Sequence, residues 1–416
     1  MNLFVLVWNY LKARPLNTVL NILLLGLGIA VITILLLFNK QLQEKITQNA
    51  KGIDLVVGAK GSPMQLILSN IFHVDFPTGN IKLADAERIA RNRLVKTAIP
   101  LALGDSYSGF RIIGTSAEYG ALYDAEIADG TWWSEPMETT LGANAARRLG
   151  LSVGATFTST HGLTTDGHSH EEQPFRVVGV LKPTNSVLDN LILTSIESVW
   201  EVHMEHNEGD ERDTQTTLTP ERPSKLVPSA SLTDSTLEIT SLLLQYRSPM
   251  GAIQMPRLVN TQSALQAASP AFETARLFSI LGVGVDILQG FAYLLIFISA
   301  LSIFIALYNS LKERRYDMAI MRSMGASRWT LLTSVLMEGS FLATLGSLLG
   351  LSLGHAALVM FRSTVSQTQM AGMESFVFYY EEWIILVGSL LLGIICAVIP
   401  AIQAWRTDIS KVLAGN

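Results

Sequence analysis

The histidines of this sequence are concentrated in one region, where they could bind a metal ion. Five of the seven lie between residues 161 and 206, in two groups that also contain aspartate and glutamate. Imidazole and carboxylate ligands together suit Zn²⁺, and short histidine-rich tracts are a known metal-binding composition. The alternative is a solvated polar loop whose histidines bind nothing, and the H-E-x-x-H spacing of zinc enzymes is missing. Zinc binding is therefore a hypothesis with these candidate ligands: His161, His168, His170, His203 and His206.

Residues 52–66 contain glycines and a lysine but do not match a phosphate-binding loop. Such a loop requires glycine, four residues, and then Gly-Lys-Ser/Thr. Here Lys60 follows Ala59 and not a glycine, so we interpret the segment as a structural turn. No nucleophile–base constellation is found elsewhere in the sequence. We therefore predict that the chain is not an enzyme and does not hydrolyse ATP itself. Its net charge of -5 gives no support for nucleic-acid binding.

The apolar residues are concentrated in four runs near the two ends of the chain. Of its 416 residues 49% are hydrophobic and only 16% are charged, whereas soluble domains carry about 25% charge. A helix of about 20 apolar residues spans the ~30 Å hydrocarbon core of a bilayer. The first run is longer than the core of a signal peptide and is followed by no small-x-small cleavage site, which favours an uncleaved anchor. The predicted transmembrane helices are 18–38, 281–309, 331–361 and 383–405.

Basic residues in the short loops predict the orientation of these helices. Lysine and arginine flank the first helix, crowd the segment 310–330 and follow the fourth helix, whereas the loop 362–382 contains one arginine and three glutamates. Short loops rich in lysine and arginine stay in the cytoplasm. We therefore expect the segments 1–17, 310–330 and 406–416 to be cytoplasmic, and residues 39–280 to lie outside.

The expected fold is an α-helical membrane domain with four transmembrane helices in a 1+3 arrangement and a large α+β extracytoplasmic domain between helices 1 and 2. The only cysteine, Cys396, lies in the fourth helix, so the external domain has no disulfide. Its residues 207–235 are polar and predict a loop. Periodicity predicts helices over 83–95, 141–149, 194–203 and 255–290, and strands over 110–115, 175–181 and 237–246.

The segment 309–330, NSLKERRYDMAIMRSMGASRWT, has an apolar edge and a basic flank. By itself it could be a helix on the lipid surface or a helix that docks in the groove of a partner. Within it, KERRYDMAIMRSMGAS resembles the E-R-x-x-E-I-x-x-L-R-x-x-G-A-S signature of permeases related to the macrolide exporter, the lipoprotein-release permeases and the cell-division protein FtsX. The end, IPAIQAWRTDISKVLAG, is similar to the P-A-x-x-A-x-x-x-D-P ending of that family. Ile409 stands where the family usually has proline, and Asp317 where glutamate is usual.

This resemblance implies a permease subunit of an ABC transporter in the bacterial inner membrane. Two copies, expected as a homodimer, would pair with two ABC ATPase subunits, and ATP would act only through those partners, with no cofactor bound directly. ATP-driven closure would move the external domain, a mechanism called mechanotransmission, to export a lipoprotein, a peptide or a small molecule with a periplasmic or lipoprotein partner. The residues that the resemblance assigns to ATPase coupling are Glu313, Arg314, Arg315, Met318, Ile320, Arg322, Gly325, Ala326 and Arg328.

Two other functions stay open at this point. One is a zinc-handling ABC system that uses the external histidine-rich loop. The other is a non-transport scaffold that regulates an extracytoplasmic hydrolase, as the cell-division relative does.

Three glycines in the third predicted span, Gly346, Gly350 and Gly354, repeat every four residues. This spacing lines one helix face with small residues and favours close approach of a neighbouring helix, although glycine is also simply common in membrane helices. The neighbour could belong to the same chain or to a second copy. Glu338, at the inner end of this span, is expected at the headgroup level beside Arg328.

Overall fold

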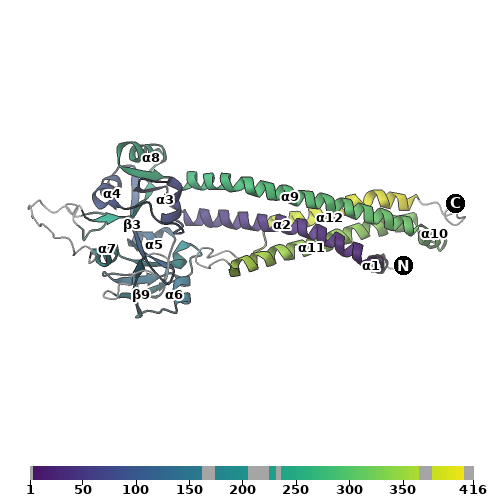
Figure 1. Cartoon of the computed structure of the whole chain (residues 1–416), viewed down its shortest axis with the longest axis horizontal. Helices are drawn as coiled ribbons and strands as arrows, with labels where there is room; N and C mark the ends of the chain where they lie inside the picture. The colour runs from purple at the N-terminus through teal and green to yellow at the C-terminus, as the bar shows by residue number, and fades with distance from the viewer. Residues whose placement is uncertain (1–2, 162–173, 205–223, 231–235, 365–376, 407–416) are drawn as a thin grey trace, which may run out of the picture. The chain divides into compact units, whose positions relative to one another are not determined.

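The computed structural model describes residues 3–161, 174–204, 224–230, 236–364 and 377–406 (Figure 1). The chain divides into two compact units. One unit, here called the helical bundle, comprises residues 1–42, 280–365 and 373–416. The other consists mainly of residues 43–279 and is here called the sheet domain.

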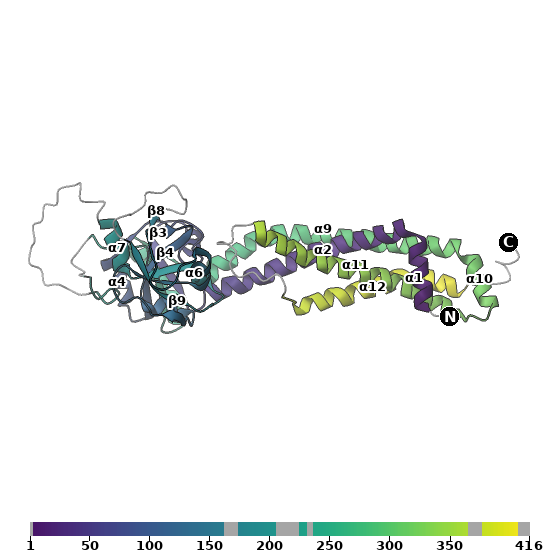
Figure 2. The same ribbon diagram turned by 90° about the horizontal axis from the view of Figure 1, so that it is seen from below.

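The helical bundle contains, among the described residues, four helices long and apolar enough to cross a membrane. One precedes the sheet domain in the chain and three follow it, so the predicted 1+3 fold is confirmed. In Figures 1 and 2 these four helices run alongside one another. They are α2 (Pro15–Asn49), α9 (Pro270–Glu313), α11 (Arg328–Thr364) and α12 (Tyr380–Trp405).

Two short helices complete the bundle. The helix α1 (Leu3–Ala13) precedes α2, in a segment to which the sequence analysis assigned no secondary structure, and α10 (Arg315–Ser323) lies between α9 and α11. Buried apolar side chains from α1, α2, α9, α11 and α12 form one core; its members include Val7, Leu25, Ile29, Ile303, Leu307, Leu342 and Ala397.

The sheet domain is built on one mixed sheet, to which eleven strands belong within the described ranges. Nine follow the order β13-β1-β12-β3-β4-β10-β6-β9-β5, with β8 beside β3 and β7 beside β9. Only the β4–β10 and β6–β9 pairs are parallel among these strands. The strands are β1 (Leu55–Ala59), β3 (Val95–Tyr107), β4 (Phe110–Thr115), β5 (Ile127–Gly130), β6 (Glu138–Leu141), β7 (Thr156–Phe157), β8 (Thr160–His161), β9 (Phe175–Leu181), β10 (Leu191–Thr194), β12 (Ser241–Tyr246) and β13 (Leu265–Ala268).

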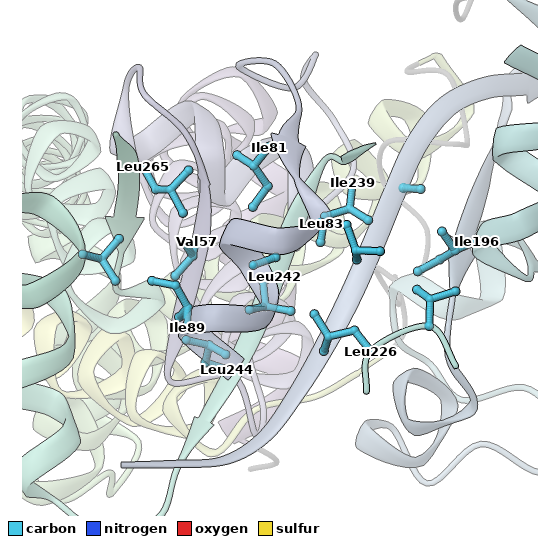
Figure 3. Close-up of a cluster of buried hydrophobic side chains, with 14 of the residues drawn as sticks. Val57, Ile81, Leu83, Ile89, Ile196, Leu226, Ile239, Leu242, Leu244 and Leu265 are labelled. Carbon is cyan, nitrogen blue, oxygen red and sulfur yellow. The ribbon is translucent and has the colours of Figure 1, made fainter. Parts of the chain in front are cut away.

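A separate pair, β2 (Ile81–Lys82) and β11 (Glu238–Ile239), and several short helices cover this sheet. Figure 3 shows the largest apolar cluster, in which Leu83 and Ile89 of α4 pack with Leu242 and Leu244 of the sheet. Each fully buried leucine or isoleucine contributes about 1.5–3 kcal/mol to folding. The helices are α3 (Pro63–Asn70), α4 (Leu83–Ala90), α5 (Ala117–Leu122), α6 (Ala143–Leu149), α7 (Ile196–Met204), α8 (Met250–Gln262) and the 3₁₀ turn η1 (Val187–Asn190).

Glu87 of α4 fixes the segment 224–230 against this core. Its carboxylate is buried and accepts hydrogen bonds from Arg91 Nε, Ser224 Oγ and the backbone of Leu226. Burial alone would raise the pKa of Glu87, but these hydrogen bonds outweigh it and lower the pKa below its usual value.

Two predicted strands, 110–115 and 175–181, are confirmed with their bounds. The predicted single helix over 255–290 is wrong, because α8 ends at Gln262 and the edge strand β13 separates it from α9. This strand pairs with β1, and a four-residue edge strand between two helices has too few residues for a period to show. The predicted turn at residues 52–66 is also wrong in extent, since it contains β1 and the start of α3, which Ser62 caps.

Candidate functional site

The segment between α9 and α11 contains one short helix, α10, and the residues at its two ends limit its length. The helix α9 ends at Glu313, and Arg314 alone has non-helical dihedral angles before α10 begins. At the other end Gly325 has a φ of +98°, a left-handed conformation that glycine adopts without strain. Ser327 then accepts a hydrogen bond from the backbone of Thr330 in the first turn of α11. The sequence GAS therefore makes a tight turn between the two helices.

One face of α10 is buried in the bundle. Met318 and Ala319 are buried on it, and Met318 packs in a cluster with Leu331, Ala401 and Ala404. The opposite face is exposed and combines apolar and aromatic side chains with the acid Asp317; Met324, next to the helix end, is 83% exposed. Tyr316, Ile320 and Trp329 are exposed around the same segment, as are the cations Arg315 and Arg328.

Arg314 points into the bundle and not toward solvent. Its guanidinium carbon lies 3.8 Å from the centroid of the Tyr10 ring, Nη2 donates to the Tyr10 carbonyl at 3.3 Å, and Nη1 lies 3.5 Å from a Glu338 carboxylate oxygen. The side chains of Arg314 and Glu338 are only 13% and 11% exposed. Nearby, Arg14 forms an ion pair with Glu313.

The contacts also show where three of the predicted residues lie. Arg314 and Met318, which were assigned to ATPase coupling, both have side chains that face the interior of the bundle, and their role in coupling stays a prediction. Glu338 pairs with Arg314 and not with Arg328, whose guanidinium lies 5.8 Å from the centroid of the Trp405 ring. The reason is the break at residue 314, which changes the direction of the chain and turns this arginine back toward α1 and α11.

Arg322, on the same short helix, has buried donors without acceptors. Within the described part of the chain, its Nε and Nη1 atoms have no hydrogen-bond partner. An unsatisfied buried donor costs about 1–3 kcal/mol.

The three regularly spaced glycines of α11 pack against α2 of the same chain. A methyl group built on Gly346 would lie 2.9 Å from Leu25 Cδ2, and one on Gly354 would lie 2.7 Å from Thr33 Cβ. On Gly350 it would lie 2.7 Å from the carbonyl oxygen of Gly26. The neighbour that the sequence left open is therefore a helix of the same chain.

In the sheet domain, the end of α2 is held by a set of polar contacts that were not predicted from the sequence. The carbonyl of Asn49 accepts a hydrogen bond from Tyr123 Oη at 2.8 Å, and its Oδ1 accepts from the backbone of Val187 at 3.0 Å. Lys45 Nζ donates to the carbonyl of Asn185 at 2.7 Å. We call these contacts the α2 socket.

The socket loop is shaped by Asp189, which is buried in η1. Its carboxylate accepts from Thr184 N at 2.8 Å, Thr184 Oγ1 at 2.9 Å and Asn185 N at 2.9 Å. The run TNSVLDN, with polar residues that favour local side-chain-to-backbone bonds, was the only sequence signal for this loop.

The candidate metal ligands are only partly within the described residues. His161 lies in β8, where it pairs with Asp105 of β3, and His203 lies in α7. His168, His170 and His206 lie outside the described residues. In the part of the chain that the structure describes, no group of three or more histidine, cysteine or acidic side chains could hold a metal ion. Zinc binding therefore stays a hypothesis.

The two isolated histidines both have structural partners. His73 Nε2 is 2.9 Å from Tyr119 Oη, and burial followed by the nearby Arg111 charge lowers the pKa of His73 to about 3. His355 Nε2 lies 2.9 Å from a carboxylate oxygen of Glu382, which links α11 to the first turn of α12.

Two family models match long parts of the chain. Residues 18–226 match the model described as MacB-like periplasmic core domain, and residues 290–409 match the model described as FtsX-like permease C-terminal.

Among curated relatives, the uncharacterized ABC transporter permease YknZ of Bacillus subtilis is 25% identical over 154 residues, which are 36% of this chain and 36% of the relative. The uncharacterized ABC transporter permease MJ1507 of Methanocaldococcus jannaschii is 26% identical over 142 residues, 33% of this chain and 35% of the relative. The matched part of the chain thus spans about a third of the length of these relatives.

Two solved structures are similar to parts of the chain. The periplasmic region of MacB from Actinobacillus actinomycetemcomitans matches with 13% identity and a TM-score of 0.34, covering 56% of this chain and 97% of that one. The extracellular domain of the transporter YknZ from Gram-positive bacteria matches with 13% identity and a TM-score of 0.30, covering 52% of this chain and 99% of that one.

Proposed function

Because the chain belongs to the family of FtsX-like and MacB-like ABC transporter permeases, we propose that it converts ATP hydrolysis by a separate ATPase subunit into movement of its sheet domain. In this proposal the sheet domain lies outside the membrane and the α10 segment lies in the cytoplasm. The functional unit contains two copies of this chain and two ATPase subunits.

The observation that carries the proposal is the exposed face of α10. A soluble loop would normally present polar side chains to water, but here Tyr316, Ile320 and Met324 are exposed together. Exposed apolar and aromatic side chains gathered on one helix suit docking into a groove of a partner protein.

Two continuous helices support the mechanical part of the proposal. The helix α9 has 44 residues, about 66 Å at 1.5 Å per residue, which exceeds the ~30 Å hydrocarbon core. The helix α2 has 35 residues and ends in the α2 socket. Each helix belongs to both units of the chain, so displacement of its membrane part can be passed along a stiff element.

This mechanism indicates which general classes of substrate the protein could move. Moving an external domain suits release of a lipoprotein, or propulsion of a peptide or small molecule through an external partner. It requires no hydrophilic path for ions through the bundle. A periplasmic or lipoprotein partner that binds the sheet domain would complete such a system.

The test of the docking surface is co-purification from native membranes. We expect the tagged full-length chain to retain a P-loop ATPase, identified by mass spectrometry. Ile320→Asp should reduce the amount retained at least tenfold, because it places a charge in the apolar face of α10. The matched control is Ile253→Asp, which places the same charge at an exposed isoleucine of α8 in the sheet domain. Equal ATPase recovery with both variants would contradict the assignment of this surface.

A further inference from the structure

We propose that Arg314 is a positioning residue that locks the coupling helix α10 to α1 and α11, so that the ATPase moves these elements together. The inference rests on the proposed function, and it assigns to this arginine a role inside the bundle and not at the ATPase surface. It is carried by the position of Arg314 at a helix break and by the three contacts of its guanidinium.

The backbone at residue 314 is a kink. The helix α9 ends one residue before it and α10 begins one residue after it. The backbone bonds from Arg314 N to Ser310 O and from Met318 N to Arg314 O are kept at 3.1 and 3.0 Å. A kink held by backbone bonds alone could bend when a partner pushes on α10, and the push would then not reach the membrane helices.

The guanidinium of Arg314 restrains this kink from two sides. It stacks on the ring of Tyr10 and donates to the Tyr10 carbonyl, both on α1, while its other terminal nitrogen faces Glu338 on α11. A planar guanidinium can stack and form directed hydrogen bonds at once, whereas a lysine ammonium at the same place would lose part of this set. One side chain thus connects three helices.

A second arginine repeats the arrangement. Arg14 is the residue between the end of α1 and the start of α2, and it pairs with Glu313, the last residue of α9. Both helix breaks in this region are therefore occupied by arginines that pair with carboxylates of other helices. Arg14 with Glu313 and Arg314 with Glu338 are thus two ion pairs, one at each helix break.

The burial of the Arg314–Glu338 pair favours a role of Arg314 inside the bundle, here called the brace, over direct contact with the ATPase. Both side chains are nearly enclosed, so a protein approaching from outside would meet Tyr316, Ile320 and Met324 first. Removing one partner of an enclosed pair leaves the other charge uncompensated. Exchanging the two charges keeps the pair, which provides the means to separate the two roles.

The experiment uses the full-length chain co-purified with its ATPase in lipid nanodiscs. The variants are Arg314→Glu, Glu338→Arg and the double exchange, with Arg314→Lys as a milder change that retains the charge. ATPase recovery is measured by quantitative mass spectrometry. Movement of the sheet domain is followed by spin-label distances between the two copies, with the label on Val153→Cys in a Cys396→Ser background.

We expect Arg314→Glu to keep at least half of the wild-type ATPase recovery while the ATP-dependent distance change falls at least fivefold. The double exchange should restore at least half of that change, and Arg314→Lys should give an intermediate loss. Loss of ATPase recovery in Arg314→Glu that the exchange does not restore would overturn the brace and make Arg314 a docking residue. An unaltered distance change in Arg314→Glu would overturn it as well. By contrast, a wild-type chain that retains no ATPase would count against the proposed function itself.

Discussion

The contact between α2 and α11 predicts opposite effects for two glycine-to-alanine substitutions. A methyl group at Gly350 would lie 2.7 Å from the carbonyl oxygen of Gly26 and 2.7 Å from Ile29 Cβ. Ordinary contact begins at 3.4 Å, so the two helices would have to separate by about 0.7 Å. Both neighbours belong to the backbone or its first side-chain atom, so no rotamer change can relieve the contact. Gly388 of α12 has no atom within 4 Å of the same methyl position and is the matched control.

The expected sizes follow from packing and helix propensity. Overpacking of a close contact costs about 1–3 kcal/mol, whereas alanine in place of glycine within a helix gains up to about 1 kcal/mol. Gly350→Ala should therefore lower the free energy of unfolding by about 1–2 kcal/mol. Gly388→Ala should leave it unchanged or raise it by up to about 1 kcal/mol.

The assay is reversible unfolding of the purified full-length chain in mixed micelles with increasing dodecyl sulfate, followed by tryptophan fluorescence. If Gly350→Ala is as stable as Gly388→Ala, the close approach of α2 and α11 is not a property of the folded chain. The reasoning on intrachain packing would then fail.

Three further predictions concern the sheet domain. The folded-state pKa of Glu87 lies below its unfolded value. Its ionised form therefore stabilises the fold above about pH 4.5, and this contribution is lost as the pH falls through the folded-state pKa. Melting temperatures measured between pH 3 and 7 should fall more steeply toward low pH in the wild type than in Glu87→Gln. Asp189→Ala removes the acceptor of three donors in the socket loop, which should cost about 1–3 kcal/mol. Thermal unfolding within 1 °C of wild type, well short of the several degrees expected, would contradict that account of the socket. Calorimetric titration of the full-length chain with zinc at neutral pH should give binding heat that is lost when the five candidate histidines are replaced by alanine; no heat in the wild type would refute the zinc hypothesis.

Local properties of the sequence were enough to predict the four long apolar helices. The length of the apolar runs and the position of the basic loops depend on neighbouring residues in the chain, and they located the four long helices and the segment between α9 and α11. Strands such as Phe110–Thr115 and Phe175–Leu181 were also predicted, because each is a short apolar run bounded by clear changes in composition. The strand β13 was missed because its evidence is its pairing with β1, more than 200 residues away in the chain.

The motif around Arg314 did not indicate which of its side chains make contacts within the bundle. Its sequence located a helix that could meet an ATPase, but it did not distinguish arginines that face a partner from an arginine that faces Tyr10 and Glu338. The same limit applied to the glycines of α11, whose neighbour could have been either chain, and to Asp189, whose role depends on the loop around the end of α2. Hydropathy and charge are local properties, so the residues alone indicated which segments are long and apolar enough to cross a membrane and which segment carries the family signature. Which charges pair and which helix faces touch can be seen only in the folded chain, because those contacts join residues up to about 300 positions apart in the sequence.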